Sequence, residues 1–435
     1  MKIKRGKYLN KLISKKNNGM IKVITGLRRS GKSYLLFELY HEYLSSIGIN
    51  DENIIELALD EDINIKYRDP LELGNYIRSK TENKEQQYYI FLDEIQQVYE
   101  IQNPYVNLPE AKVGFVDVLL GLMKIKNLDI YITGSNSRML STDILTTFRG
   151  RGDEIKVNPL TFAEFYNAYE EDKHNALRDY MTYGGMPYVM TLKNHEDKSS
   201  YLKDLFARTY LSDVIERNKV NNEKGILEDL LNIISSSIGS LTNPSKLSKT
   251  FKSVKQTTIA SQTIEKYLDY FIDAFLIKKA YRYDVKGKKY INTPLKYYFS
   301  DIGLRNARLN FRQQEENHIM ENIIFNELIA RDFDVDVGVV EYNSKDDTGK
   351  KVRVQLEVDF IANKGSNRFY IQSALHIDTD EKREQEINSL LRVDDSFKKI
   401  VVVKDNINPW YDENGIFYIG VEEFLLKEQV MDSYI

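Results

Sequence analysis

One segment of the chain places glycines, a lysine and a hydroxyl residue at a spacing that suits phosphate binding. Residues 26–33 read G-L-R-R-S-G-K-S, which fits the pattern G-x-x-x-x-G-K-[S/T]. In this pattern the glycines let backbone N–H groups converge on phosphate oxygens, the lysine reaches the β- and γ-phosphates, and the hydroxyl binds Mg²⁺. We therefore predict that Lys32 contacts the phosphates and that Ser33 is a ligand of Mg²⁺. The residues expected at the nucleotide are Gly26, Leu27, Arg28, Arg29, Ser30, Gly31, Lys32, Ser33 and Tyr34.

Two acidic residues follow a second apolar run and suit a metal-assisted hydrolysis. Residues 88–92 read Y-Y-I-F-L and are followed by Asp93 and Glu94. A continuous apolar run is typical of a parallel strand buried on both faces, and α/β sheets bind ligands at the carboxyl ends of such strands. We expect Asp93 to hold Mg²⁺ through water and Glu94 to polarise the attacking water.

Two later loops carry polar side chains that could complete this site. The first loop covers residues 134–138, which read G-S-N-S-R. Here Asn136 or Ser135 could touch the γ-phosphate or the attacking water, although an ordinary strand-to-helix turn explains the segment equally well. In the second, residues 148–152 read F-R-G-R-G, and Arg149 or Arg151 could act as an arginine finger on the nucleotide of a neighbouring subunit. The finger would require a homo-oligomer, and a plain surface loop is the alternative.

The phosphate-binding segment lies between a predicted strand and a predicted helix. Residues 20–25 read M-I-K-V-I-T, which indicates a short buried strand, and apolar residues recur at helical spacing from Tyr34 to Tyr43. The amino terminus of that helix adds a favourable dipole for an anion. This order of strand, loop and helix predicts an α/β domain with a P-loop and a parallel sheet.

These segments resemble one family, the AAA-superfamily ATPases of bacteria and archaea whose C-terminal half is a domain of unknown function. The resemblance covers nearly the whole chain, and it rests on residues 26–33, 92–94, 133–135, 150–151, 159–162 and 183–187. It implies an ASCE-type P-loop sheet and ATP as the nucleotide, in keeping with the lack of an N-K-x-D guanine motif in the sequence. It also implies a catalytic base directly after the Walker B aspartate, and this role falls on Glu94.

The middle of the chain predicts a winged helix-turn-helix. The predicted helices cover residues 227–238, 245–251 and 262–274, and the predicted hairpin strands cover residues 276–283 and 289–291. Lysine and arginine far outnumber aspartate and glutamate between residues 245 and 290, and the first 33 residues contain no acidic residue. Both segments are therefore expected to contact DNA or RNA, with salt-sensitive and mostly non-specific binding. A solvated basic face, or a winged helix that contacts protein, is the alternative.

The last third of the chain resembles the outline of PD-(D/E)XK nucleases. Glu321 on a predicted helix, Asp359 on a predicted strand and Gln372 on the next strand match that outline, but Ala374 stands where a lysine is expected. Without the positive charge of a lysine at this position, the negative charge that develops in the transition state of cleavage loses a stabilising partner. We therefore expect a nuclease-like fold kept for binding or assembly, with active metal-dependent cleavage as the less favoured alternative.

Length and composition set the remaining limits. At roughly 150 residues per domain, the 435 residues predict about three domains. The absence of cysteine excludes disulfides, thiolate zinc sites and a cysteine nucleophile. Without a long apolar run or a signal peptide, we expect a cytoplasmic protein with no membrane contact. The predicted parts are an ATPase domain (1–165), a helical connector (166–222), the winged helix (223–300) and the nuclease-like domain (301–435).

Three functions follow from these predictions. The favoured one is a Mg²⁺-dependent ATPase that couples ATP hydrolysis to a conformational change of a nucleic-acid-binding C-terminal region. The second is a DNA-binding regulator that uses ATP as a switch with little hydrolysis. The third is a metal-dependent nuclease gated by ATP, which the alanine at position 374 makes doubtful.

Overall fold

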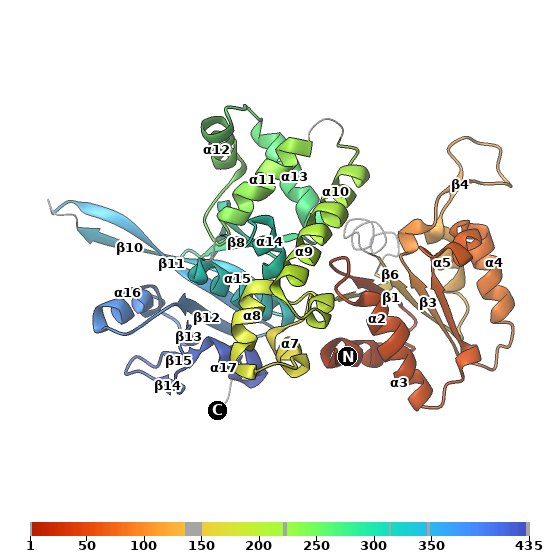
Figure 1. Ribbon diagram of the computed structural model, residues 1–435, viewed down its shortest axis with the longest axis horizontal. Coiled ribbons are helices and arrows are strands. Elements are labelled where there is room, and N and C mark those ends of the chain that lie inside the picture. The colour runs from red at the N-terminus through yellow and green to blue at the C-terminus, as the bar shows by residue number, and fades with distance from the viewer. Residues whose placement is uncertain (1, 135–149, 221–223, 313–314, 346–348, 432–435) are drawn as a thin grey trace. The chain divides into compact units, whose positions relative to one another are not determined.

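A computed structural model describes residues 2–134, 150–220, 224–312, 315–345 and 349–431 (Figure 1). The chain forms two compact units. Residues 2–159 with residues 273–275 make up the N-terminal unit, and residues 160–272 with residues 276–435 make up the C-terminal unit. Asn136, Ser135 and Arg149 lie outside the described residues.

The N-terminal unit is built on a parallel sheet of five strands. In chain order these are β1 (Ile21–Thr25), β2 (Ile54–Ala58), β3 (Tyr88–Asp93), β6 (Leu128–Thr133) and β7 (Gly152–Lys156). Their order in the sheet is β2-β3-β6-β1-β7, and every pair is parallel. One strand, β6, therefore separates β1 from β3, which is the arrangement implied by an ASCE-type sheet. The predicted P-loop α/β fold is confirmed.

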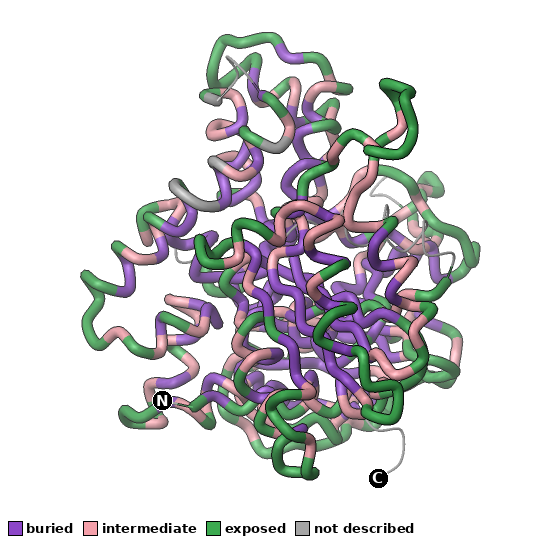
Figure 2. Tube along the Cα trace, turned by 90° about the vertical axis from the view of Figure 1, so that its right-hand side faces the viewer, coloured by how far each residue is buried: buried purple, intermediate pink, exposed green. Residues whose placement is uncertain are grey.

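The sheet is buried on both faces, as the continuous apolar run of β3 predicts. Tyr89 and Phe91 pack into one hydrophobic cluster with helix α1 (Gly6–Ser14) and the helix that follows the phosphate loop. Ile90 and Leu92 pack into the other cluster with α4 (Pro70–Lys80) and α5 (Phe115–Leu122). Successive strand side chains point to opposite faces, so both layers of helices are needed to cover the strand. Figure 2 shows these buried segments in purple.

The helix after the phosphate loop changes its winding along its length. It begins as α2 (Lys32–Tyr34), continues as the π-helical segment η1 (Leu35–Tyr40) and ends as α3 (His41–Ser46). The other short elements of this unit are η2 (Asp51–Asn53), η3 (Asp62–Arg68), η4 (Ile95–Gln97), and the paired strands β4 (Ile101–Gln102) and β5 (Lys112–Val113).

The C-terminal unit begins with helices. These are α7 (Phe162–Ala168), η6 (Lys173–Asn175), α8 (Ala176–Tyr183), η7 (Pro187–Thr191), α9 (His195–Asp204), η8 (Leu205–Leu211), α10 (Ser212–Arg217), α11 (Lys224–Ser236), α12 (Pro244–Lys255) and α13 (Ser261–Asp273). The three helices expected from residue 227 onward are present as α11, α12 and α13. No helix of the described residues is both long and apolar enough to cross a membrane.

An eight-stranded mixed sheet forms the rest of the C-terminal unit. Its strands are β8 (Ile277–Asp284), β9 (Lys289–Phe299), β10 (Asp334–Lys345), β11 (Lys351–Lys364), β12 (Asn367–Ala374), β13 (Lys398–Val403), β14 (Trp410–Tyr411) and β15 (Phe417–Gly420). They lie in the order β14-β15-β13-β12-β11-β10-β8-β9. The accompanying helices are α14 (Ile302–Arg308), α15 (Glu316–Ala330), α16 (Asp380–Leu391), α17 (Val421–Leu426) and η9 (Glu428–Met431).

The hairpin of β8 and β9 belongs to this sheet. The sequence predicts the hairpin as the wing of a separate domain that ends at residue 300. In the structure β8 pairs in parallel with β10, with Arg282 opposite Val337. This pairing satisfies backbone groups that an isolated wing would expose. The division of the C-terminal unit at residues 222 and 300 stays a prediction.

Candidate nucleotide site and buried acidic residues

The phosphate loop has a backbone that only glycine can follow at one position. Gly26 has φ 138°, and a Cβ atom there would lie 2.1 Å from the carbonyl oxygen of Val157. Gly31 has φ 93° and directly precedes the helix that begins at Lys32. The loop therefore packs closely against residue 157. The residues that follow it form the amino terminus of a helix, where backbone N–H groups can bind a phosphate.

The predicted nucleotide ligands differ in how far they are exposed. Lys32 is buried, and its ammonium donates to the carbonyl oxygens of Gly26 and Leu27 at 3.1 Å each. Ser33 and Arg29 are exposed, whereas Ser30 is buried. The remaining predicted ligands are half-buried at Arg28, Gly31 and Tyr34, and buried at Gly26 and Leu27.

The two predicted acids lie at the carboxyl end of β3. Asp93 is buried, and its carboxylate accepts a hydrogen bond from the hydroxyl of Thr133 at the end of β6. The backbone N–H of Glu94 donates to the same hydroxyl at 3.3 Å. Thr133 thus joins two strand ends of the sheet, a role that residue-type patterns alone did not assign to it. An oxygen donor set of Ser33 and Asp93 fits Mg²⁺, a hard cation.

Glu94 has the backbone and the electrostatics of a functional residue. It adopts φ 51° and ψ 49°, a left-handed conformation that costs free energy for a non-glycine residue and is concentrated at functional sites. Burial raises the pKa of Glu94, while the charge of Lys32 acts in the opposite direction. Its carboxylate also accepts a hydrogen bond from the side-chain amide of Gln96. Sequence reasoning missed Gln96, because an amide two residues after the acid belongs to no motif that we used.

Arg151 is exposed just before β7, and its carbonyl oxygen accepts the N–H of Ile21. Its role as an arginine finger stays a prediction.

The basic N-terminal segment is partly internal. The sequence predicts a surface for polyanions there, but Arg5 is buried and Lys22 forms a buried ion pair with Asp129. Arg5 donates from Nη1 to the carbonyl oxygen of Ser30 at 3.0 Å and from Nη2 to that of Asn158 at 2.6 Å. Through these hydrogen bonds the guanidinium links the phosphate loop to the segment that follows β7.

We expect Arg5→Met to weaken ATP binding about tenfold, because the loss of both hydrogen bonds lets the phosphate loop shift. Titration of a fluorescent ATP analogue measures the dissociation constant. Lys4→Met is the matched control, since Lys4 is an exposed neighbour of the same charge. An affinity unchanged from wild type would contradict the role of Arg5.

The acids of the nuclease-like outline also come together. Glu321 on α15 and Asp359 on β11 are both buried. A carboxylate oxygen of Asp359 accepts the N–H of Ser373 at 2.9 Å, and the side-chain oxygen of Gln372 accepts the N–H of Asp359 at 3.4 Å. Burial raises the pKa of Asp359, and the charge of Glu321 adds to this effect.

The position of the expected lysine is filled by a buried methyl group, since Ala374 is 1% exposed. Instead, Lys296 on β9 places its ammonium 2.8 Å from a carboxylate oxygen of Glu321 and 2.7 Å from one of Glu357. Sequence reasoning missed Lys296, because it lies far from residues 359–374 along the chain.

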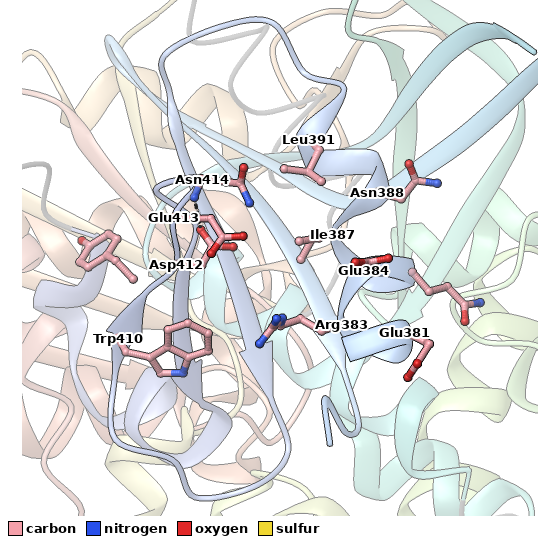
Figure 3. Close-up of a pocket in the computed structure, with 12 residues that line it drawn as sticks. Glu381, Arg383, Glu384, Ile387, Asn388, Leu391, Trp410, Asp412, Glu413 and Asn414 are labelled. Atoms are coloured by element: carbon pink, nitrogen blue, oxygen red, sulfur yellow. Dashed lines mark hydrogen bonds between the residues drawn. The ribbon is translucent and has the colours of Figure 1, made fainter. Parts of the chain in front are cut away.

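A cavity of about 810 Å³ lies elsewhere in the C-terminal unit, between α16 and the segment around β14 (Figure 3). Charged and amide side chains such as Glu384, Asn388 and Glu413 line it, and the Trp410 ring beside it stacks on Tyr418 with the ring centroids 4.3 Å apart. None of the predicted site residues lines this cavity.

Comparison with known proteins shows to which family this chain belongs. A protein of Haemophilus influenzae described as uncharacterized is 35% identical over 433 residues, which covers 98% of this chain and 99% of that protein. The chain belongs to the family of this protein. Residues 18–166 match the family described as an AAA domain, and residues 174–315 match a domain of unknown function. The N-terminal unit is thus an AAA-type P-loop domain, as the resemblance implied.

Other relatives are more distant. An uncharacterized protein of Methanocaldococcus jannaschii is 29% identical over 449 residues, covering 99% of this chain and 90% of its own length. Among solved structures, the chain is similar to a Walker-type ATPase of Pyrococcus abyssi, with 15% identity, a TM-score of 0.46, and coverage of 71% of this chain and 96% of that one. It is also similar to Cdc6p from Pyrobaculum aerophilum, with 11% identity, a TM-score of 0.28, and coverage of 73% and 94%.

Proposed function

We propose that this AAA-family protein hydrolyses ATP with Mg²⁺ and uses the reaction to change the conformation of a C-terminal unit that binds nucleic acid. The observation that carries the ATPase part is the position of Glu94. Its strained backbone holds a half-buried carboxylate at the end of β3, within the electrostatic influence of Lys32. The acid and the phosphate-binding lysine therefore share one edge of the sheet, where α/β folds bind ligands.

Each residue at this edge has a distinct proposed role. Lys32 binds the β- and γ-phosphates, Ser33 and Asp93 hold the cation, and Glu94 orients the attacking water and accepts its proton. Mg²⁺, when bound, would supply positive charge to offset the phosphate oxygens. Thr133 positions Asp93 and Glu94 through its hydroxyl, which donates to the carboxylate of Asp93 and accepts the N–H of Glu94.

The proposed nucleic-acid surface is the predicted winged helix, made of α11 to α13 and the hairpin of β8 and β9. Lys249 and Lys252 on α12, and Lys288 and Lys289 at the hairpin turn, are exposed. Within the described part of the chain these four lysines have no ion pair, whereas Lys255 pairs with Asp229 at 2.7 Å. Exposed ammonium groups without a carboxylate partner suit phosphates, and they would give salt-sensitive binding.

We expect nucleic acid to stimulate ATP hydrolysis. The rate would be measured with single-stranded DNA, double-stranded DNA and RNA, each over a range of salt concentrations. Lys249→Gln combined with Lys252→Gln should abolish most of the stimulation and lower the salt dependence of binding by about two units of logarithmic slope, because two phosphate contacts are lost.

Lys124→Gln combined with Lys126→Gln is the control with the same change of charge, because both lysines are exposed in the N-terminal unit. Hydrolysis that no polymer stimulates would refute the coupling. Tight ATP binding with negligible hydrolysis would favour the regulator instead.

A further inference from the structure

A histidine and two aspartates meet at the carboxyl ends of two strands of the C-terminal unit. Among the residues that the structure describes, His376, Asp378 and Asp405 can each offer one ligand atom such that all three atoms lie within 4.8 Å of one another. All three residues are exposed. They belong neither to the nucleotide site nor to the nuclease-like outline, and we call them the His–Asp trio.

The pairing of β12 with β13 brings two members of the trio together. These strands run parallel with Ala374 opposite Val403, and just beyond them the N–H of Lys404 donates to the carbonyl oxygen of Ala374 at 3.0 Å. His376 and Asp405 each come two residues after these paired positions. They therefore leave the sheet side by side at its carboxyl edge, where α/β folds bind ligands.

The spacing of the ligand atoms is close to that around one metal ion. Nδ1 of His376 lies 3.0 Å from a carboxylate oxygen of Asp405. Bonds of about 2.1 Å to a tetrahedral Zn²⁺ place two of its ligands about 3.4 Å apart. A zinc ion could therefore take the place of the proton between these two atoms with little movement of either side chain.

The backbone around the trio is held by neighbouring elements. The end of β15 packs against Asp405, since a Cβ atom at Gly420 would lie 2.9 Å from the carbonyl oxygen of Asp405. Asp378 directly precedes Thr379, whose side chain caps α16. The three ligands thus project from fixed positions, and only their exposed side chains need to adjust when an ion binds.

The two carboxylates of the trio have no basic partner that would compete with a metal ion. In the described part of the chain, neither Asp378 nor Asp405 pairs with a lysine or an arginine, and Asp405 pairs with His376 alone. Lys404, the neighbour of Asp405 in the sequence, pairs with Glu316 of α15 instead. With a neutral imidazole the trio carries two negative charges, which one divalent cation would balance.

We propose that the His–Asp trio binds Zn²⁺ and that the ion joins the segment after β13 to the connection between β12 and α16. One imidazole nitrogen with two carboxylate oxygens suits Zn²⁺, whereas Mg²⁺ and Ca²⁺ favour oxygen ligands alone. Because the trio is exposed, water can supply the fourth ligand. The unfolded chain does not hold these distant residues together, so bound zinc should stabilise the folded C-terminal unit.

The test uses the full-length protein after removal of metal ions, without nucleotide and with an excess of Mg²⁺. The Mg²⁺ fills sites that offer oxygen ligands alone, such as the one proposed at Ser33 and Asp93. Calorimetry with ZnCl₂ measures the affinity and the stoichiometry, and the visible absorption of Co²⁺ in place of Zn²⁺ reports the geometry around the ion. Since no nucleotide is present, failure of the ATPase proposal would leave these readouts unchanged.

Wild type should bind one Zn²⁺ per chain and unfold at a higher temperature with zinc than without it. His376→Ala and Asp405→Asn should each weaken Zn²⁺ binding more than about 100-fold, because losing a ligand costs more than losing a partner of a ligand. Asp378→Asn should also weaken binding, whereas Asp378→His should retain it, since an imidazole nitrogen can replace the carboxylate oxygen. Without zinc, Asp378→Asn should unfold as wild type does, because the substitution lies at the surface.

His41→Ala is the matched control. His41 also lies beside two carboxylates, with Nδ1 2.7 Å from Glu56 and Nε2 3.4 Å from Asp51, but these acids face opposite ring nitrogens. The affinity of His41→Ala for Zn²⁺ should therefore equal that of wild type. Wild type that binds no Zn²⁺ in the presence of Mg²⁺ would overturn the proposal. Wild-type affinity in His376→Ala, or an equal loss of affinity in His41→Ala and His376→Ala, would overturn it as well.

Discussion

Glu94→Gln should bind ATP with nearly wild-type affinity and hydrolyse it about 100-fold to 10,000-fold more slowly, the range expected for loss of a general base. The amide keeps the shape of the side chain but cannot accept a proton. The left-handed backbone at Glu94 fixes the side chain at the end of β3, so no neighbouring acid replaces it without rebuilding the turn. Single-turnover hydrolysis and nucleotide titration separate the two effects.

The pH dependence gives a second readout of the same residue. Because burial raises the pKa of Glu94, the ionised base is lost as pH falls through a value above that of an ordinary glutamate. Hydrolysis by wild type should therefore decline at mildly acidic pH, and the residual activity of Glu94→Gln should not follow that decline. Glu61→Gln, an exposed site soon after β2, is the control. Wild-type turnover in Glu94→Gln would exclude Glu94 as the base.

Asp301→Asn should destabilise the C-terminal unit by about 2–3 kcal/mol at pH 5. The substitution replaces one of the two side-chain oxygens that accept buried backbone N–H groups with an amide nitrogen, which cannot accept a hydrogen bond. The Asp301 carboxyl accepts the N–H of Gly185 at 2.7 Å and that of Leu304 at 3.1 Å. The space beside it is tight, since a Cβ atom at Gly184 would lie 2.3 Å from the same carboxyl. An asparagine has one acceptor oxygen, and its amide nitrogen would face a donor.

Burial raises the pKa of Asp301 to about 6. The folded state therefore binds this proton more tightly than the unfolded chain, and the resulting stabilisation is complete below pH of about 4. It is lost as pH rises through about 6. Denaturant titration followed by Trp410 fluorescence should show the difference between wild type and Asp301→Asn shrinking between pH 5 and pH 7. Asp378→Asn, at an exposed site, is the control, and a constant or growing difference would refute this account.

The sequence was most informative where chemistry and local structure coincide. The phosphate loop and the pair Asp93 and Glu94 each follow a short apolar strand, so residue type, spacing and strand end could all be read from adjacent positions. The parallel sheet that brings them together is a common consequence of alternating strands and helices. For this reason the N-terminal fold could be predicted before its long-range contacts were known.

Contacts between distant segments could not be predicted in this way. Arg5 and Lys296 look like any other basic residues in the sequence, and only tertiary packing shows that one holds the phosphate loop and the other pairs with the buried carboxylate of Glu321. The hairpin of β8 and β9 illustrates the same limit for strands. Its turn was evident from the sequence, but alternation of residues does not say which strand becomes its neighbour.

The pairing of β8 with β10 has a consequence for how this protein can be divided. A fragment that ended near residue 300 would leave β10 with an unpaired edge in the remaining piece and β8 with one in the fragment. Such edges favour aggregation of the separated pieces. The helices α11 to α13 and the strands after residue 334 should therefore be inherited, expressed and exchanged between relatives as one block. A chimera whose junction lies near residue 160 respects the sheet, whereas one joined at residue 300 cuts through it.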